Sequence, residues 1–177
     1  LNQLFYRLES HHKIMDCVFC KIAKREIPSK IITESKNSIA FLDAFPLTRG
    51  HTLVIPKYHY EKIQDMTDND NMDLFDMLHK VISKVDKITG STLLAIHNGK
   101  QSGQEIPHVH VHLIPRQLDD LAGPVHSMFK NRPKLSDEEL EELFPHHESS
   151  LELPLNHQVY LELHMSIHQD LNLRNYL

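Results

Sequence analysis

Three histidines, His108, His110 and His112, stand at alternate positions in one short stretch of the sequence. Apolar residues fill the positions between them. In a β-strand, a period of two places alternate side chains on one face, so this spacing predicts three imidazoles on one face and apolar side chains on the other. Alternate side chains lie about 6.6–6.8 Å apart, close enough for neighbouring imidazoles to act on one small ligand. A strand with an ordinary polar face is the alternative, because histidine makes up 15 of the 177 residues.

Imidazole groups in this arrangement can do nucleophilic chemistry at phosphorus. A neutral imidazole is among the groups that form covalent catalytic intermediates, and the ordinary histidine pKa of about 6.5 leaves it unprotonated near neutral pH. Neighbouring imidazoles can fix its tautomer and donate N–H bonds to phosphate oxygens, on which negative charge builds. The loop of residues 98–104 contains two glycines, and its backbone N–H groups could hold a phosphate.

Metal binding is the rival use of the same residues. Imidazoles that alternate on a strand also bind zinc in hydrolytic sites, where the metal activates a water molecule. Cys17 and Cys20 have a spacing typical of structural zinc sites, and His59 and one histidine of the triad are candidates for the other two ligands. Inert thiols remain an alternative for the cysteines. A redox role would need a thioredoxin-like context that this sequence lacks.

Composition places the chain among ordinary globular proteins. Its 177 residues suit one domain, or one domain with a tail, and the formal charge of −5 without a long basic block does not favour nucleic acid as a partner. No run of 18 apolar residues predicts a membrane span, and no secretory signal is visible. We therefore expect a cytoplasmic protein without a disulfide framework.

Hydrophobic periodicity predicts an α+β fold with a five-stranded antiparallel sheet, one long helix and one short helix. Asp68 is the expected N-cap of the long helix and Gly90 its C-terminal stop. Five apolar residues at spacings of three and four predict the inward face of this helix: Met72, Phe75, Leu78, Ile82 and Val85. The expected elements are a helix over 17–25, strands over 31–34, 38–42 and 51–56, a helix over 69–89, and strands over 91–97 and 107–114.

Three regions follow from these patterns: an N-terminal extension over 1–14, a domain over 15–116 and a C-terminal extension over 117–177. Met15 is a plausible natural start. In the C-terminal extension, a capping box from Ser136 to Glu139 predicts a short acidic helix that Pro145 stops. Alternating apolar residues over 151–155 and 159–167 then favour a β-hairpin.

The histidine stretch, His108-Val-His-Val-His-Leu-Ile, resembles the signature of the histidine triad (HIT) superfamily of nucleotide hydrolases and transferases. The likeness extends over residues 15–116 and continues in these segments: Phe41-Leu42-Asp43, Gly50-His51-Thr52-Leu53-Val54-Ile55-Pro56-Lys57, Asn98-Gly99 to Gln104, Phe19-Cys20-Lys21-Ile22 and Glu26-Ile27-Pro28-Ser29-Lys30. The branch with the greatest likeness is the Hint-like one, although the Pro-Arg after the histidines is also similar to the fragile-histidine-triad branch.

This resemblance implies a role for individual residues. His110 matches the nucleophile that takes the nucleotidyl group, His112 the histidine beside the α-phosphate, and His51 the histidine that supports the nucleophile. Asp43 matches the acidic residue that binds the ribose hydroxyls, with a loop-capping aspartate as the alternative. Asn98 and Gln104 match contacts on the phosphate side. The apolar clamp around a purine, which on periodicity alone would be plain core, matches Val18, Phe19, Ile22, Phe41 and Leu53.

Two departures qualify the resemblance. Glu105 stands where eukaryotic Hint proteins have a serine near the leaving group, so the leaving-group preference is open. The paired cysteines resemble the zinc-bearing microbial HIT proteins instead, which implies a structural zinc ion held by Cys17, Cys20, His59 and His108.

The resemblance also implies an activity and an assembly. The implied reaction is hydrolysis or transfer at the α-phosphate of purine nucleotide derivatives, such as nucleoside phosphoramidates or adenylated compounds, through a nucleotidyl-histidine intermediate. Dinucleoside polyphosphate hydrolysis and a nucleotide-binding scaffold with little turnover are the alternatives. The implied assembly is a homodimer with a joined ten-stranded sheet.

Overall fold

The computed structural model describes residues 17–148 of the chain. It divides into two compact units, Leu1–Ala122 and Gly123–Leu177, and each is described by itself. The predicted N-terminal extension and the predicted C-terminal hairpin lie outside the described residues. Among the described helices, none combines the length and the apolar composition that crossing a bilayer requires.

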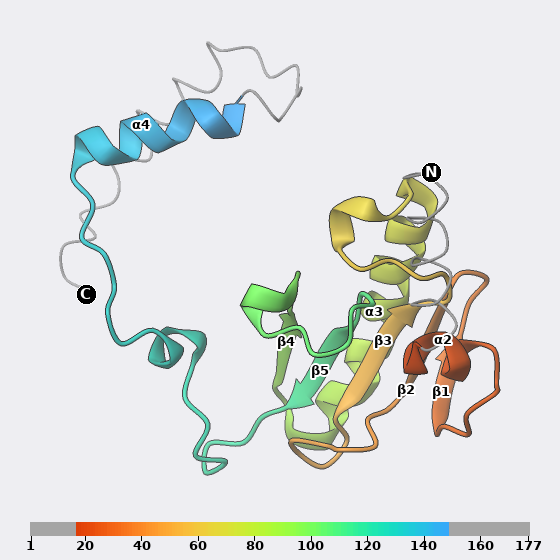
Figure 1. Cartoon of the computed structure of the whole chain (residues 1–177). Helices are drawn as coiled ribbons and strands as arrows, with labels where there is room; N and C mark the ends of the chain where they lie inside the picture. Colours follow the sequence, from red (N-terminus) through yellow and green to blue (C-terminus); the bar gives the residue numbers. More distant parts are fainter. Residues whose placement is uncertain (1–16, 149–177) are drawn as a thin grey trace, which may run out of the picture. The chain divides into compact units, whose positions relative to one another are not determined.

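A five-stranded antiparallel sheet forms the centre of the first unit (Figure 1). The strands follow the order β1-β2-β3-β5-β4, so the sheet and its antiparallel pairing confirm the predicted fold class. The first four strands lie within one residue of their predicted bounds, whereas β5 begins four residues later than predicted. The strands are β1 (Ile31–Glu34), β2 (Ser38–Leu42), β3 (Thr52–Pro56), β4 (Thr92–Ile96) and β5 (Val111–Pro115).

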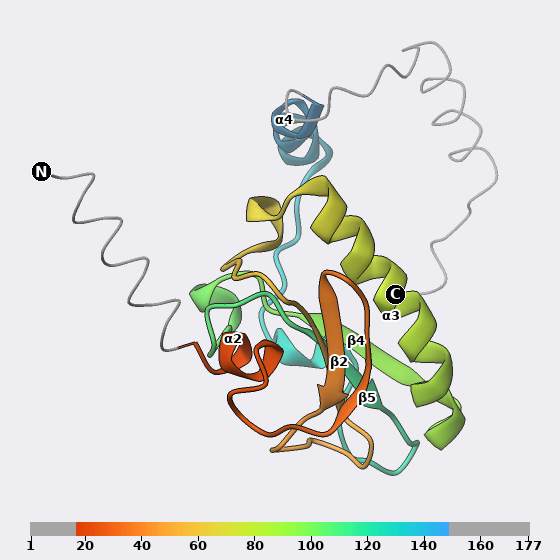
Figure 2. The same cartoon turned by 90° about the vertical axis from the view of Figure 1, so that its right-hand side faces the viewer.

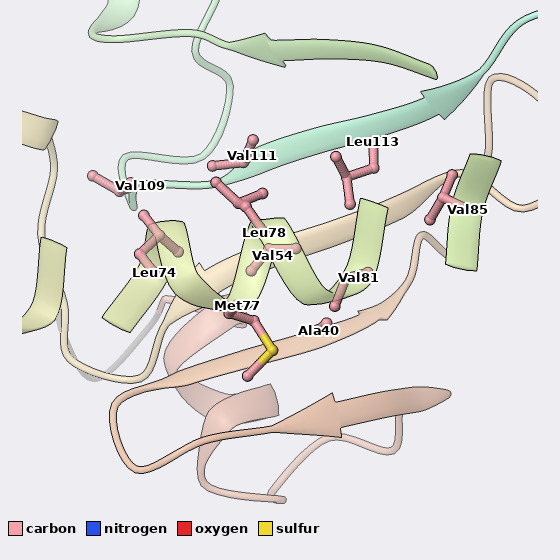
Figure 3. Packing of buried hydrophobic residues seen from close by; sticks show 10 residues of the cluster. All are labelled: Ala40, Val54, Leu74, Met77, Leu78, Val81, Val85, Val109, Val111 and Leu113. Atoms are coloured by element: carbon pink, nitrogen blue, oxygen red, sulfur yellow. The ribbon is translucent and has the colours of Figure 1, made fainter. Parts of the chain in front are cut away.

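Two helices cover opposite faces of this sheet, because alternate residues of each strand point to opposite sides. Helix α3 (Asp68–Thr89) packs on the face that carries Ala40 and Val54 (Figures 2 and 3). Helix α2 (Val18–Ala23) packs on the other face, against Phe41 and Leu53. The histidines of the triad lie on the α2 side, since the apolar residues between them belong to the core beneath α3.

The inward face of α3 agrees with the prediction at Leu78, Ile82 and Val85, which are buried or pack against the core, and differs from it near the start of the helix. Met72 and Phe75 are exposed, and the buried apolar residues are Leu74, Met77, Leu78, Val81 and Val85. Both sets follow the helical period, so periodicity alone did not distinguish them. The sheet decided between them, because the helix presents to it the stripe that fits against Val109, Val111 and Leu113 (Figure 3).

A pair of substitutions tests this face. Leu74 is fully buried, so Leu74→Ala is expected to lower the free energy of unfolding by about 2–5 kcal/mol through lost burial and a cavity. Met72→Ala removes an exposed side chain and should change stability by no more than about 0.5 kcal/mol. Chemical denaturation of both variants measures the difference. A larger loss from Met72→Ala would contradict this packing.

Both ends of α3 and the C-terminal end of α2 have identifiable caps. Thr67, rather than the predicted Asp68, is the N-cap of α3, because its side-chain oxygen accepts the backbone N–H of Asp70. Gly90 ends α3 in the left-handed conformation, as predicted. Helix α2 ends two residues earlier than predicted. Arg25 has a φ of 64°, and the backbone N–H groups after the helix bond back to it in a Schellman pattern.

Within the second unit, the described residues contain a 3-10 turn, η3 (Val125–Met128), and helix α4 (Asp137–Glu148). The predicted capping box is present: the Ser136 backbone N–H donates to the Glu139 carboxylate at 2.7 Å, and the Glu139 N–H donates to the Ser136 hydroxyl at 3.2 Å. The prediction that Pro145 stops this helix is wrong. A proline removes one helical hydrogen bond, but the helix continues to Glu148.

Candidate active site

The three histidines lie on one side of the sheet but have different surroundings. Strand β5 begins only at Val111, so His108 and His110 precede it. The pairing of β3 with β5 stops at Val54 and Val111, and continuing it would place residue 109 opposite Pro56, which has no N–H to donate. The Val109 N–H instead donates to the Tyr60 carbonyl at 2.7 Å.

A cavity of about 740 Å³ opens on the α2 side of the sheet, and His110 and His112 line it. His51, which directly precedes β3, and Asp43, which directly follows β2, line the same cavity. The structure therefore brings the predicted catalytic residues and the predicted ribose ligand to one site. The predicted apolar clamp lines it as well: Val18, Phe19, Ile22, Phe41 and Leu53.

Hydrogen bonding sets the tautomer of His110. Its Nδ1 lies 2.6 Å from the backbone carbonyl oxygen of His108, and a carbonyl can only accept. Nδ1 therefore carries the hydrogen and donates it, while Nε2 keeps its lone pair. Burial lowers the pKa of His110, which favours this neutral form. A neutral imidazole with a free Nε2 lone pair is the form that can attack an electrophile.

A second relay sets the tautomer of His112. The backbone N–H of Leu47 donates to His51 Nδ1 at 3.2 Å, so His51 carries its hydrogen on Nε2. His51 Nε2 lies 3.0 Å from His112 Nδ1 and donates to it, which leaves the His112 hydrogen on Nε2. Burial lowers the pKa of His112 to about 4, so the ring is neutral near neutral pH and still offers an N–H.

Asp43 approaches the same relay without joining it by a hydrogen bond. Its Oδ2 lies 3.4 Å from His51 Nδ1, the nitrogen that accepts the Leu47 N–H. Burial lowers the pKa of His51 more than the Asp43 charge raises it. Asp43 Oδ1 accepts the Phe45 backbone N–H at 2.9 Å, which holds the carboxylate at the cavity. The second oxygen can still accept bonds from a ligand.

A separate cluster forms between α2 and the sheet. Cys17, Cys20, His59 and His108 each offer one ligand atom, and these atoms all lie within 4.8 Å of one another. His108 Nδ1 lies 3.4 Å from Cys17 Sγ and 3.6 Å from Cys20 Sγ, and Cys20 Sγ lies 3.4 Å from His59 Nδ1. Tetrahedral zinc bonds of about 2.3 Å to sulfur and 2.0 Å to nitrogen place neighbouring ligands about 3.5 Å apart. The cluster therefore fits such an ion.

The protonation of this cluster also suits a metal. His108 Nε2 donates to the Pro56 carbonyl at 2.9 Å, which leaves the Nδ1 lone pair facing the two sulfur atoms. Burial lowers the pKa of His108 to about 4, so the ring is neutral. Burial also raises the pKa of the Cys20 thiol to about 12, and a bound divalent cation would supply the charge that a thiolate there needs.

A second group with metal-ligand geometry contains Asp43, His51 and His112. Its three ligand atoms would leave a coordination position open, as metal-activated water requires. However, the hydrogen bond from His51 Nε2 to His112 Nδ1 already uses the lone pair of one ring. The Cys–His cluster has no such competition for His108 Nδ1, so it is the better metal site.

Comparison with known proteins decides the family. The model of the HIT domain matches residues 24–119, which is more than half of the 177-residue chain. The chain belongs to the HIT domain family. The HIT domain thus covers the sheet, α3 and the three histidines.

Two curated relatives of this HIT protein carry activities in their names. It is similar to adenosine 5'-monophosphoramidase HNT1 of Saccharomyces cerevisiae, with 45% identity over 107 residues, 60% of this chain and 66% of that protein. It is similar to adenylylsulfatase HINT3 of Arabidopsis thaliana, with 34% identity over 134 residues, 75% of this chain and 68% of that protein. The HIT protein is accordingly a hydrolase of the HIT type.

A solved structure agrees with the HIT fold. The histidine triad nucleotide-binding protein of Candida albicans matches with a TM-score of 0.67 and 29% identity, over 76% of this chain and 96% of that chain. The two structures share the fold of a five-stranded antiparallel sheet with helices.

Two predicted phosphate contacts of the HIT domain do not line the cavity. The Asn98 side chain accepts the Ile63 N–H at 3.0 Å, next to the 3-10 turn η1 (Ile63–Asp65). The Gln104 side chain is buried, accepts the Gly99 N–H at 3.1 Å and donates to the Glu61 carbonyl at 2.8 Å. Both amides therefore brace the loop that contains η2 (Lys100–Ser102), and their contact with phosphate stays a prediction.

Sequence reasoning missed one histidine of the HIT cavity. His97 lines the cavity, and its ring centroid lies 5.7 Å from that of His112. It follows β4 directly, so extending the predicted strand pairing by one residue could have placed it beside the triad. Lys30 also lines the cavity, and it was not predicted from the sequence as a site residue. Glu105, which stands where eukaryotic Hint proteins have a serine near the leaving group, lines the cavity as the resemblance implied.

Proposed function

We propose that this HIT-type hydrolase acts at the α-phosphate of purine nucleotide derivatives through a nucleotidyl-histidine intermediate on His110. The observation that carries the proposal is the 2.6 Å bond from His110 Nδ1 to the His108 carbonyl, which leaves Nε2 as a nucleophile. The substrates are nucleoside phosphoramidates or adenylated compounds. Supporting this class, the two named relatives are an adenosine monophosphoramidase and an adenylylsulfatase.

In the proposed reaction, His110 Nε2 attacks the α-phosphorus and the bond to the leaving group breaks. His112 donates its Nε2–H to a phosphate oxygen on which negative charge grows, and His51 holds the His112 ring in that tautomer. Water then attacks the phosphorus, and the bond from phosphorus to His110 breaks. Throughout, Asp43 binds the ribose hydroxyls and the apolar clamp holds the base.

We also propose that the Cys–His cluster holds a structural zinc ion. Its donor set and its ligand spacing support a closed tetrahedral site. Bound there, the ion would tie α2, which carries part of the apolar clamp, to the segment that begins the triad. His108 then has a structural role as a zinc ligand, whereas His110 and His112 take part in the reaction.

The homodimer and the cytoplasmic location belong to the same proposal. Strand β4 is an edge strand of the sheet, and its Leu94 is 44% exposed, which suits joining with a second chain. The two cysteines of the described segment are free, as thiols in a reducing compartment would be.

A substrate screen tests the proposed function. Wild-type protein is expected to hydrolyse adenosine 5'-phosphoramidates and adenosine 5'-phosphosulfate with kcat/KM at least about tenfold above that for diadenosine polyphosphates, a difference of about 1.4 kcal/mol. Release of AMP, followed by chromatography, measures each rate. Faster cleavage of the polyphosphates would favour the dinucleoside polyphosphate alternative. Tight AMP binding without turnover of any substrate would favour the scaffold.

A further inference from the structure

His97 occupies a defined place next to the proposed nucleophile. Strand β4 pairs with β5 so that Ala95 lies opposite His112 and Ile96 opposite Val111. Continuing this register by one residue places His97 opposite His110. Because side chains alternate, residue 97 shares a sheet face with residue 95 and therefore with His112.

The surroundings of His97 hold its ring at the cavity wall. On one side it meets His112 edge to face, with an interplanar angle of 69°. On the other side the loop backbone comes close: Gly103 has a φ of 96°, and a Cβ built there would lie 3.6 Å from His97 Cδ2. The side chain is only partly buried and lines the cavity, so a ligand can reach it.

The proposed reaction still needs a proton for its leaving group. His110 is the nucleophile, and His112 is a neutral ring whose pKa of about 4 keeps its cationic form scarce. His51 has both ring nitrogens in hydrogen bonds with Leu47 and His112. An amine that leaves phosphorus as an anion is strongly disfavoured, so an acid at the site would raise the rate.

We propose that His97 is the catalytic acid that protonates the leaving group, which rests on the proposed function. As His110 Nε2 bonds to phosphorus, the phosphorus–nitrogen bond breaks, its electron pair stays on the leaving nitrogen, and a ring N–H of cationic His97 protonates that nitrogen. Neutral His97 then takes a proton from the attacking water as the phosphorus–His110 bond breaks. Both residues return to their starting forms.

The other titratable groups at the cavity fit this step less well. Asp43 binds ribose in the proposed function and sits beside His51. Glu105 is exposed and acts on His110 through its charge, which favours cationic rather than neutral His110. Lys30, which directly precedes β1, also lines the cavity. His97 meets the His112 ring edge to face and is not assigned to ribose binding.

Leaving groups of different basicity test the role. Two adenosine 5'-phosphoramidates are compared, one with an alkylamine and one with a nitroarylamine, which departs with less help from an acid. For His97→Gln, we expect the single-turnover rate with the alkylamine substrate to fall about 10²-fold or more, the typical contribution of a general acid. With the nitroarylamine substrate, the fall should stay within about fivefold, since little proton transfer is required there.

Control variants separate this role from others. His79→Gln makes the same change at an exposed position of α3 and should leave both rates unchanged. An equal loss on both substrates in His97→Gln would overturn the proposal and reduce His97 to a structural or phosphate contact. A selective loss in Glu105→Gln but not in His97→Gln would overturn it too. Failure of the proposed function looks different, because wild-type protein would then turn over neither substrate.

Discussion

His110→Asn is expected to lower the rate of nucleotide hydrolysis by at least about 10⁴-fold, because no other group at the site replaces its lone pair. Nucleotide binding should persist, since Asp43 and the apolar clamp remain. Acid quenching of a reaction with labelled substrate measures the covalent species directly. No nucleotidyl-enzyme should be captured from this variant, while equilibrium binding of AMP should stay within about threefold of wild type.

His112→Asn provides the matched comparison. The residue donates a hydrogen bond to the transition state without forming a covalent bond, and losing one such donor typically costs about 10²–10³ in rate. This variant should therefore still form the adduct, only more slowly. Equal residual rates in the two variants, or an adduct in the absence of His110, would mean that the nucleophile has been assigned to the wrong histidine.

Removing zinc should have the second large effect. Protein purified without chelator is expected to contain one zinc ion per chain, and Cys20→Ser should lose it together with much of the stability that the metal supplies. A ligand at 1,000 times its Kd stabilises the folded state by about 4 kcal/mol, so the loss should appear as a clear drop in Tm. Elemental analysis and thermal unfolding measure the two quantities.

Chelator treatment supplies the control for the metal. It should lower the Tm of wild-type protein and leave that of Cys20→Ser unchanged, because the variant has no ion to lose. Hydrolysis should survive until the fold loosens, whereas metal-activated water at the group of Asp43, His51 and His112 would lose activity at once. A zinc content near zero, with Cys17→Ser melting like wild type, would remove the zinc site from the proposal.

The sequence by itself determined the elements and much of the site, because those signals are local. The alternation from His108 to Leu113 predicted which side chains face the core, and the hairpin of β1 and β2 followed from two strand patterns around a turn. Gly90 and the capping box at Ser136 are also local signals, and both are present.

Tertiary structure decided what depends on packing between distant segments. The first turns of α3 offered apolar residues on two sides with the same period, and only contact with the sheet selected Leu74 over Met72. Pairing between strands determines where β5 begins, because Pro56 cannot continue the ladder as a donor.

The tautomers of the histidines likewise depend on the tertiary structure. A tautomer depends on which atom lies against each ring nitrogen, and no spacing in the sequence reveals that the His108 carbonyl binds His110 Nδ1 or that Leu47 binds His51. The side chain of Gln104 bonds to backbone groups of Gly99 and Glu61 instead of lining the cavity. His97 reaches the cavity because β4 and β5, which are separated by 14 residues along the sequence, lie side by side in the sheet.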